Sequence, residues 1–415
     1  MCGITGFWQS GSFSGGSIEV IASQMAERIT HRGPDDSGVW LDDSSGMVLA
    51  HQRLSIVDLS SAGHQPMVSA SGRYVIVFNG EIYNHLEIRS ELEKQSRVSS
   101  TTKEVGVKIH WHGHSDTETL LAGFEAWGIE AMLKKTVGMF AIALWDREEK
   151  VLTLARDRMG EKPLYYGFQN KTFLFGSELK ALKVHPEFLG EIDRDVLCLY
   201  LRHCYIPAPY SIYKGIQKLL PGTYLQVRLA DNASSQTLTP KVYWSMTDVA
   251  TQGVATPFEG SEAEAIEALD SQLRQSIGLQ MEADVPLGAF LSGGVDSSAV
   301  VALMQTQSMR PVKTFSIGFD EAGYNEAVYA KAVAQHLGTE HTELYVSADE
   351  AMAVIPLLGK IYDEPFADSS QIPTFLVSQM AKQDVTVSLS GDGGDELFCG
   401  YNRYGLADHW GRIEK

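Results

Sequence analysis

The pattern of apolar residues changes midway along the chain, and this change constrains the fold more than any other feature. Before about residue 228, short strand-like runs follow one another with few helical stretches between them. After about residue 262, strand-like and helix-like segments alternate. The first pattern is typical of antiparallel sheets layered with helices, and the second of a parallel α/β sheet. Because 415 residues suffice for two or three domains, we expect one domain of each kind.

The first half gives several local expectations. Its strand-like runs are 39–41, 47–50, 74–78, 138–145, 151–155 and 173–175. Apolar residues recur at helical spacing from Ile18 to Ile29, and Ser115 with Glu118 has the pattern of a capping box that opens another helix. The polar segment 95–109 shows no clear period, so we predict a surface insertion there.

The second half alternates in the manner of a parallel sheet, which binds ligands at the carboxyl ends of its strands. Its strand-like runs are 285–291, 313–319, 340–346 and 384–390. One helix is expected to end near Leu337 with Gly338 as its cap, and another to begin at Ser347 with Glu350. Residues 228–262 are linker-like. The sequence stops at Lys415, soon after a glycine-rich turn, so we expect the α/β domain to be incomplete.

Charge and composition argue against several classes of protein. The chain has 34 basic and 52 acidic residues, a net charge of −18, and no Lys/Arg block, which argues against nucleic-acid binding. The longest apolar runs, such as 139–145, are too short to span a membrane, and the N-terminus does not resemble a secretory signal. The four cysteines form no CxxC pair, so a reducing cytoplasm is the expected compartment.

Cys2 is the first candidate for chemistry. Removal of Met1 would leave Cys2 with a free α-amino group beside its thiol, and an N-terminal nucleophile uses that amine as its own base. On position alone, a small residue near a flexible end is the alternative interpretation.

A second candidate is FNGEIYN (78–84), which directly follows a strand-like run. The Asn79 amide and the Gly80 N–H are typical donors to an oxyanion, and Glu81 stands next to them. Taken alone, Asn-Gly also fits a plain hairpin turn, so both interpretations stay open at this stage.

Arg53 and Asp116 form a candidate clamp for a free amino acid. The planar fork of Arg53, in HQRLSIVD, suits a carboxylate, and Asp116, in HSDTET, suits an ammonium group. As isolated residues, both would equally fit surface positions.

Two glycine-rich segments, SGGVDSS (292–298) and SGDGGDE (390–396), each follow a predicted strand. In the first segment, the candidate hydrogen-bond donors to an anion are the backbone N–H groups of Gly293 and Gly294 and the hydroxyls of Ser292, Ser297 and Ser298. No lysine follows, so a pyrophosphate fits better than the γ-phosphate of a P-loop. Asp296 and, from the second segment, Asp395 are candidate Mg²⁺ ligands, and Ser390 and Gly391 are expected to face a nucleotide. An ordinary glycine-rich turn is the alternative.

Three alternate histidines, His110, His112 and His114, have the spacing of metal ligands on a strand. Because no further ligand cluster accompanies them, we predict a structural or incidental role.

Together these motifs resemble a known family. The segments MCGITGFW, HRGPDDSG, HQRLSIVD, FNGEIYNH, HSDTETLL and ARDRMGEKPLYY follow in the order seen in class II glutamine amidotransferase domains. SGGVDSS and SGDGGDE resemble the ATP-pyrophosphatase domain of glutamine-hydrolysing asparagine synthetases. The resemblance covers nearly the whole chain apart from 95–109 and the linker.

The resemblance implies an α+β N-terminal-nucleophile αββα sandwich followed by an α/β Rossmann-like ATP-pyrophosphatase domain that is incomplete at its C-terminus. The implied domains are a glutaminase domain at 2–212, a connecting segment at 213–262, and a truncated synthetase domain at 263–415. In the first, Cys2 would attack the glutamine amide, and Asn79 and Gly80, followed by Glu81, would form the oxyanion hole. The residues that would hold the glutamine backbone are Arg53, Leu54, Ser55, Ile56, Val57 and Asp116.

In the second domain, the resemblance implies that Leu291, Ile317, Ser390 and Gly391 line ATP and that Asp296 and Asp395 bind Mg²⁺. Asp392 stands where asparagine synthetases often have glutamate, at a position tied to acyl-adenylate formation, which leaves the acceptor acid open. The implied function is glutamine-dependent asparagine synthesis from glutamine, aspartate and ATP, with ammonia passing between the sites. The alternatives are amidation of another carboxylate, such as a sugar acid in surface-polysaccharide synthesis, and a truncated chain with a glutaminase or regulatory role only. A homodimer is left open.

Overall fold

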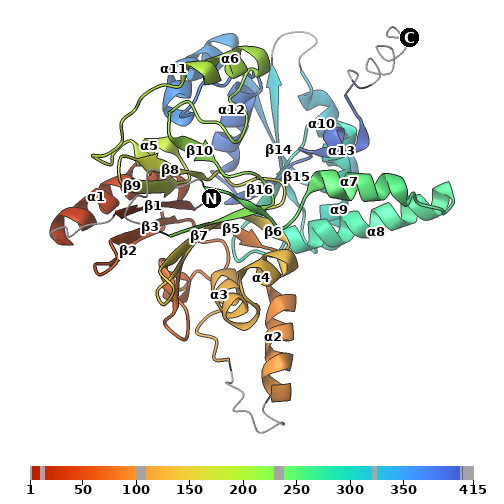
Figure 1. The fold of residues 1–415 in the computed structure, drawn as a ribbon. Helices are drawn as coiled ribbons and strands as arrows, with labels where there is room; N and C mark the ends of the chain where they lie inside the picture. The colour runs from red at the N-terminus through yellow and green to blue at the C-terminus, as the bar shows by residue number, and fades with distance from the viewer. Residues whose placement is uncertain are drawn as a thin grey trace, which may run out of the picture. The chain divides into compact units, whose positions relative to one another are not determined.

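The computed structural model describes residues 2–9, 15–99, 109–228, 238–319, 325–401 and 404 (Figure 1). The chain divides into two compact units. Unit 1 comprises Met1–Phe258 together with Gly359–Ala367, and unit 2 comprises Glu259–Leu358 and Asp368–Lys415. A short stretch from the second half of the sequence therefore belongs to the first unit.

Unit 1 contains two six-stranded sheets with antiparallel pairing of their long strands. In order, the first sheet consists of β10 (Ile216–Lys218), β8 (Tyr165–Gln169), β9 (Thr172–Gly176), β1 (Gly3–Gln9), β3 (Met47–Arg53) and β2 (Asp36–Asp42). The second sheet consists of β12 (Lys241–Val242), β11 (Thr223–Val227), β7 (Val151–Arg156), β6 (Gly138–Asp146), β5 (Tyr74–Ile82) and β4 (Met67–Val68). All six strand-like runs of the first half lie within these strands, as predicted.

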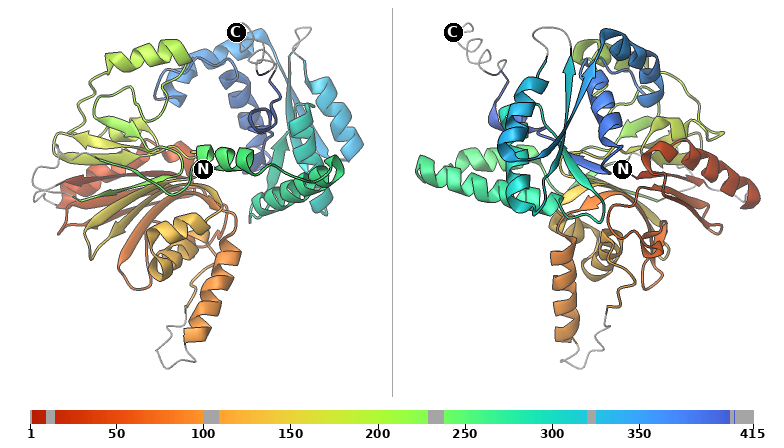
Figure 2. Two further views of the ribbon diagram at one scale, coloured as in Figure 1. Left: turned by 45° about the vertical axis from the view of Figure 1, so that its right-hand side comes forward. Right: turned by 180° about the vertical axis from the view of Figure 1, so that it is seen from behind.

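Three apolar clusters separate four layers. The cluster around Trp145 and Phe173 fills the space between the two sheets. A second cluster packs α2 (His85–Ser99), α3 (Asp116–Trp127) and α4 (Ile129–Lys135) on the outer face of the second sheet. A third packs α1 (Gly15–Glu27) and α5 (Leu179–Leu182) on the outer face of the first sheet. The predicted αββα sandwich is confirmed, and Figure 2 shows its helices on the two outer sides.

Several local expectations are corrected. Asn79 and Gly80 do not form a hairpin turn, because both pair with β6 inside β5, opposite Ala141 and Phe140. Ser115 caps α3 as predicted, accepting the Glu118 N–H at 3.3 Å, but the Glu118 carboxylate accepts N–H groups of the preceding loop instead of closing a capping box. Of the segment 95–109, residues 95–99 continue α2, and 100–108 lie outside the described residues.

The connecting segment 213–262 contains regular structure, and part of it, β12 and α7 (Met246–Ala255), lies within the stretch 228–262 expected to be linker-like. The connecting segment supplies β10 to one sheet and β11 and β12 to the other, and it includes α7, which has no buried residue. Its strands are short, and polar residues interrupt the alternation by which a strand is detected. The domain boundaries given above stay a prediction.

Unit 2 contains a four-stranded parallel sheet in the order β15 (Glu340–Val346), β14 (Lys313–Phe319), β13 (Leu287–Phe290) and β16 (Val387–Leu389). One apolar cluster joins α8 (Glu262–Gln280), α9 (Val295–Gln307) and α10 (Ala327–Leu337) to this sheet, and another joins α12 (Gln371–Ala381). The predicted alternation is confirmed, as are the left-handed Gly338 cap and the start of α11 (Ala348–Ile361) at Ser347.

The strand order of unit 2 places its glycine-rich segments together. β13 comes first in the sequence, and the order then runs outward through β14 and β15 before β16 returns to the other side of β13. The carboxyl ends of β13 and β16 thus flank the point where the strand order reverses, which is where open α/β sheets bind ligands.

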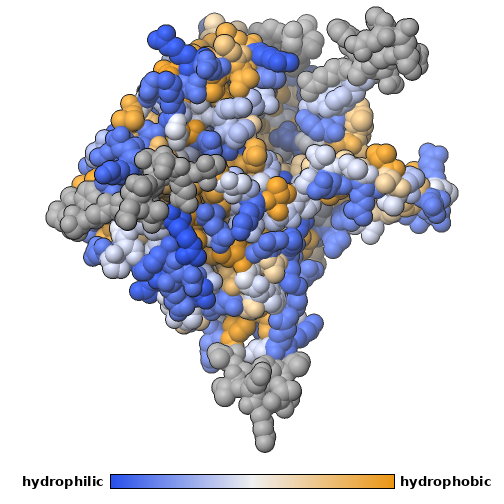
Figure 3. All heavy atoms as spheres, viewed as in Figure 1, coloured by the Kyte–Doolittle hydropathy of each residue, from blue (hydrophilic) through white to orange (hydrophobic). Residues whose placement is uncertain are grey.

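Hydrophilic residues predominate on the face drawn in Figure 3, with apolar residues scattered among them in small groups. Along the described stretches, no helix combines the length and the apolar character that crossing a membrane requires.

Candidate functional site

Four segments of unit 1 meet around one small cavity of about 30 Å³. Cys2 directly precedes β1, Arg53 ends β3, Gly80 and Glu81 lie in β5, and Asp116 begins α3. β1 and β3 are neighbours in one sheet, whereas β5 belongs to the other. The residues that line the cavity are Cys2, Arg53, Leu54, Ile56, Val57, Gly63, Gln65, Phe78, Gly80, Glu81, Ser115, Asp116 and Thr117.

The Cys2 thiol lies against the backbone that follows β3. Its Sγ is 3.5 Å from the Leu54 carbonyl oxygen, to which it donates, and 3.4 Å from the Leu54 nitrogen, from which it accepts. Burial raises the pKa of the Cys2 thiol, and the bond from Leu54 only partly offsets this. The thiol is therefore protonated near neutral pH, so it needs a base to act as a nucleophile.

Asn79 is fully buried, and neither its side-chain oxygen nor its nitrogen has a hydrogen-bond partner among the described residues. Its position in β5 continues the row of Val75 and Val77, whose side chains fill the space between the sheets. Buried amides are almost always hydrogen-bonded, because an unpaired one costs free energy. The buried amide of Asn79 lies two residues from Glu81, which lines the cavity. We therefore expect a bound ligand to provide the hydrogen-bond partner that this amide lacks among the described residues.

Two buried carboxyl groups face the same cavity. Burial raises the pKa of Glu81 to about 8, with a further increase from the charge of Asp116 and a decrease from Lys162. Burial also raises the pKa of Asp116 to about 6, against the hydrogen bond that its Oδ2 accepts from the Ile82 N–H at 2.9 Å. A cationic group between them would favour the ionised form of both carboxyls.

The Arg53 guanidinium is held by backbone carbonyls. It donates to the carbonyl oxygens of Ser60, at 3.0 Å, and Asp58. Gly63 makes room for it, since a Cβ atom on Gly63 would overlap a guanidinium nitrogen of Arg53. Because this tight fit leaves the Arg53 side chain little conformational freedom, less conformational entropy is lost when it binds a carboxylate.

The structure gathers most of the residues predicted for glutamine and adds others. Ser55 and Asn79 are not among the lining residues; the Ser55 N–H donates to Asp35 at 2.8 Å. Sequence reasoning missed Gln65, whose side chain accepts from the Phe78 N–H at 2.7 Å and donates to Thr117 Oγ1 at 3.2 Å. A lone glutamine in a turn-rich stretch gives no chemical pattern from which this role would be predicted.

In unit 2, the segment after β13 forms a compact turn at the start of α9. Gly293 has a φ of 82°, and a Cβ there would lie 2.7 Å from the backbone nitrogen of Ala330, so glycine is required. Ser292 Oγ and Ser297 Oγ are 2.9 Å apart, and the Ser292 N–H donates to Ser297 Oγ at 3.2 Å. The Ser298 hydroxyl is buried without a partner among the described residues.

The segment after β16 lies directly against this turn. A Cβ on Gly391 would be 2.7 Å from the Ser297 nitrogen, and a Cβ on Gly394 would overlap the Asp296 carboxylate. Asp392 is exposed and accepts a hydrogen bond from Ser390 Oγ at 3.0 Å. The two glycine-rich segments therefore form one continuous edge, while Ile317 lies in the neighbouring β14.

Asp296 and Asp395 supply carboxylate oxygens, the ligands that Mg²⁺ prefers. Asp296 lies beside Gly394, the residue before Asp395. No three histidine, cysteine or acidic side chains gather into a metal cage within the described ranges. Mg²⁺ that arrives on a nucleotide needs only one or two protein carboxylates, so these donors fit it.

The cavity and the layers of unit 1 define the class of protein, a glutamine amidotransferase domain. The family model described as a glutamine amidotransferase domain matches residues 1–244, and that described as asparagine synthase matches residues 268–414. The chain belongs to the family of glutamine-hydrolysing asparagine synthetases.

Two relatives found by sequence carry the name of the same family. A Bacillus subtilis protein named glutamine-hydrolysing asparagine synthetase 1 is 36% identical over 97% of this chain and 59% of its own length. A Methanocaldococcus jannaschii protein, provisionally named a second such synthetase, is 35% identical over 97% of this chain and 76% of its own length. A solved structure of a glutamine phosphoribosylpyrophosphate amidotransferase from B. subtilis has a TM-score of 0.41 and 14% identity over 82% of this chain and 65% of that one. The chain thus spans about 60% of the length of its Bacillus relative.

Proposed function

We propose that this chain carries out glutamine-dependent asparagine synthesis. Glutamine would be hydrolysed in unit 1, and its amide nitrogen would be transferred in unit 2 to aspartate that ATP has activated. The observation that carries the proposal is the cavity that brings Cys2, Arg53 and Asp116 together with Gly80, whose neighbour in the sequence, Asn79, has a buried amide without a partner among the described residues. Arg53 would hold the α-carboxylate of glutamine, and Asp116 with Glu81 would hold its α-ammonium group.

In unit 1, removal of Met1 would free the α-amino group of Cys2, which would take the thiol proton as the sulfur attacks the amide carbon. The Asn79 amide and the Gly80 N–H would stabilise the oxyanion. Ammonia would then leave with the proton from the α-amino group, and water would hydrolyse the thioester to give glutamate. Glutamine and water would thus become glutamate and ammonia, with the thiol restored.

In unit 2, the β-carboxylate of aspartate would attack the α-phosphorus of ATP and release pyrophosphate. Ammonia would displace AMP from the β-aspartyl-adenylate and give asparagine. The backbone donors and hydroxyls after β13, with Leu291, Ile317, Ser390 and Gly391, would bind the nucleotide, and Asp392 would stand near the acyl-adenylate. Mg²⁺ held by Asp296 and Asp395 would neutralise phosphate charge when bound. The four unpaired cysteines fit the predicted reducing cytoplasm.

The identity of the acceptor acid is tested with a panel of carboxylates supplied with glutamine and Mg-ATP. We expect aspartate to yield asparagine, glutamate, AMP and pyrophosphate in equal amounts, and intact mass to show that Met1 is absent. Amidation of another acid, with no asparagine, would contradict aspartate as the acceptor while leaving both half-reactions in place.

A further inference from the structure

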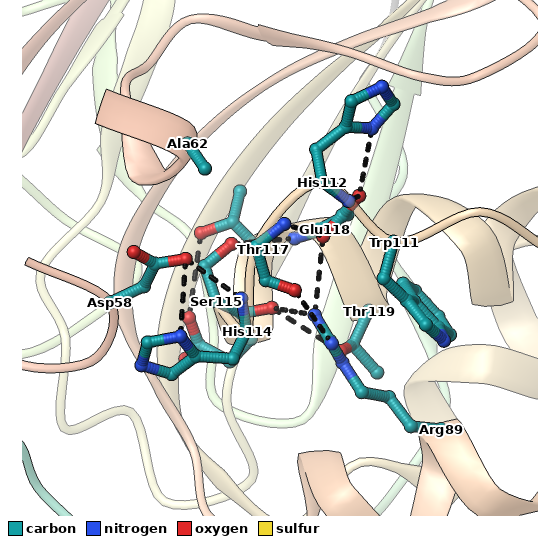
Figure 4. A network of polar contacts seen from close by, with 12 residues as sticks. Asp58, Ala62, Arg89, Trp111, His112, His114, Ser115, Thr117, Glu118 and Thr119 are labelled. Atoms are coloured by element: carbon teal, nitrogen blue, oxygen red, sulfur yellow. Dashed lines mark hydrogen bonds and ion pairs between the residues drawn. The ribbon is translucent and has the colours of Figure 1, made fainter. Parts of the chain in front are cut away.

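The buried carboxylate of Asp58 ties the loop that precedes α3 to the turn that follows Arg53, and Figure 4 shows its contacts with His114 of that loop. The Asp58 side chain is 1% exposed. One oxygen accepts hydrogen bonds from the N–H of Ser60, at 3.1 Å, and from the Ser60 hydroxyl. The other accepts from the N–H of His114 at 2.8 Å, with the His114 Nδ1 3.6 Å away. Asp58 therefore joins two loops that are far apart in the sequence.

On one side, Asp58 determines where Arg53 lies. The carbonyl oxygens that hold the Arg53 guanidinium are those of Asp58 itself and of Ser60. Asp58 has a φ of 60°, a left-handed conformation that a residue with a Cβ adopts only when its surroundings support it. The bonds from Ser60 to the Asp58 carboxylate provide that support.

On the other side, Asp58 determines where Asp116 lies. His114 precedes Asp116 by two residues, and Ser115 between them is the cap of α3. Arg89 of α2 braces the same loop from its far side, donating to the carbonyl oxygens of Gly113 and Ser115, each at 2.9 Å. The loop is thus fixed between a carboxylate and a guanidinium.

The Asp58 carboxylate makes these contacts with both loops as an anion. Burial raises its pKa, but the hydrogen bonds from Ser60 and His114 outweigh burial and leave the pKa below its ordinary value. Hydrogen bonds to an ionised carboxylate are stronger than those to a neutral group. Asp58 is therefore a rigid link near neutral pH.

We propose that Asp58 is a positioning residue that sets the spacing between Arg53 and Asp116, and so matches the clamp to a ligand carrying both an α-carboxylate and an α-ammonium group. The proposal rests on the proposed function, because it takes Arg53 and Asp116 as the two ends of the glutamine clamp. A ligand with both groups must meet both partners at once, whereas a ligand with one group can shift to meet its single partner. A change in the distance between Arg53 and Asp116 therefore weakens the binding only of ligands that carry both groups.

The test compares three probes on the full chain carrying Cys2→Ala, so that nothing is hydrolysed. The probes are L-glutamine, 4-carbamoylbutanoate, which lacks the ammonium group, and 4-aminobutanamide, which lacks the carboxylate. In Asp58→Asn, the side chain cannot accept from both Ser60 and His114 without turning an NH₂ group toward a donor. We expect the Kd for glutamine to rise about tenfold or more. The Kd of each of the two probes that lack one charged group should change less than about threefold.

A second variant moves the loop without removing a charge. A Cβ on Gly113 would overlap the Asp58 carboxylate, so Gly113→Ala should give the same selective loss of glutamine affinity, and it tests the proposal if Asp58→Asn does not fold. Asp43→Asn, at an exposed carboxylate, is the matched control and should leave all three Kd values unchanged.

Equal weakening of all three probes, or an unchanged Kd for glutamine in folded variants, would overturn the role of Asp58. Failure of the Cys2→Ala parent itself to bind glutamine would instead contradict the proposed function, and this inference with it.

Discussion

The two candidate sites are built in different ways. In the cavity of unit 1, Arg53, Glu81 and Asp116 are each only 6% exposed. In unit 2, Ser292 and Asp392 are exposed, and Asp296 and Asp395 are half-buried. The two carboxyl groups of the buried site have raised pKa values, and backbone groups hold Asp116 and Arg53, whereas the glycine-rich segments of unit 2 are held chiefly by one another.

This difference indicates how each site recognises its ligand. Charged groups that neighbouring backbone fixes in a buried site are in place before the ligand arrives, so they can select an amino acid by the distance between two charges. Exposed turns that present several N–H groups and hydroxyls bind a phosphate chain through many weak, interchangeable donors. We therefore expect single substitutions to have larger effects in unit 1 than in unit 2.

The largest effect is expected for Cys2→Ala. Loss of the thiol removes the nucleophile, so glutamine hydrolysis should fall by about 10³-fold or more. Asparagine formation from free ammonia should continue, because unit 2 does not use the thiol. Glutamate release and ammonia-dependent asparagine formation are measured on the same preparation. Loss of both activities together would show that the two sites are not separable.

Gly63→Ala should affect the glutamine site almost as strongly. The added methyl group overlaps the Arg53 guanidinium, so we expect the KM for glutamine to rise about 100-fold, with a smaller change in kcat. Gly253→Ala, where a Cβ meets nothing within 4 Å, is the matched control. A normal KM in folded Gly63→Ala would contradict the assignment of Arg53 to the substrate carboxylate.

In unit 2, Asp296→Asn should weaken Mg-ATP binding by about tenfold, because one carboxylate of an exposed site is lost. Glutamine hydrolysis should stay within about twofold of the unchanged protein. Calorimetric titration with Mg-ATP measures the first, and glutamate release measures the second. Undiminished affinity would remove Asp296 from the set of Mg²⁺ ligands.

The remaining prediction concerns the stability of the fold and how it changes with pH. Because burial raises the pKa of Glu81 from 4.5 to about 8, the folded chain holds a proton that the unfolded chain releases between these values. Stability should therefore fall as pH rises from about 4.5 to 8. Glu81→Gln has no carboxyl group to deprotonate, so it should be more stable than the unchanged chain at pH 8, by about 4 kcal/mol, with little difference at pH 4.5.

Unfolding in urea at the two pH values measures this difference. Glu87→Gln, at an exposed carboxylate, is the control and should show no such dependence on pH. Equal stability of Glu81→Gln and the unchanged chain at both pH values would show that Glu81 ionises without penalty in the fold.

The fold could be predicted from the sequence where periodicity is strong. The strands at 313–319 and 340–346 have the predicted bounds, because each is a continuous run between turn residues. The strand β12 could not be found, since two residues carry no period. Asn79 and Gly80 show how tertiary pairing overrides turn propensity: the ladder with β6 extends through a dipeptide that favours a hairpin turn.

The candidate site could be predicted only in part, and for a different reason. Cys2, Arg53 and Asp116 carry chemistry that suits a substrate, so a motif identifies them. Asp58, Gln65 and Gly63 act on other protein groups through hydrogen bonds or by leaving space, and such roles depend on which segments meet in the fold.

The proposed function requires that one chain transfers the amide nitrogen of glutamine to aspartate. The direct test is incubation of the full chain with glutamine carrying ¹⁵N in its side-chain amide, together with aspartate and Mg-ATP. We expect asparagine with ¹⁵N in its side-chain amide, matched by equal amounts of glutamate and AMP. Accumulation of ¹⁵N-ammonium with no labelled asparagine would contradict the proposed function.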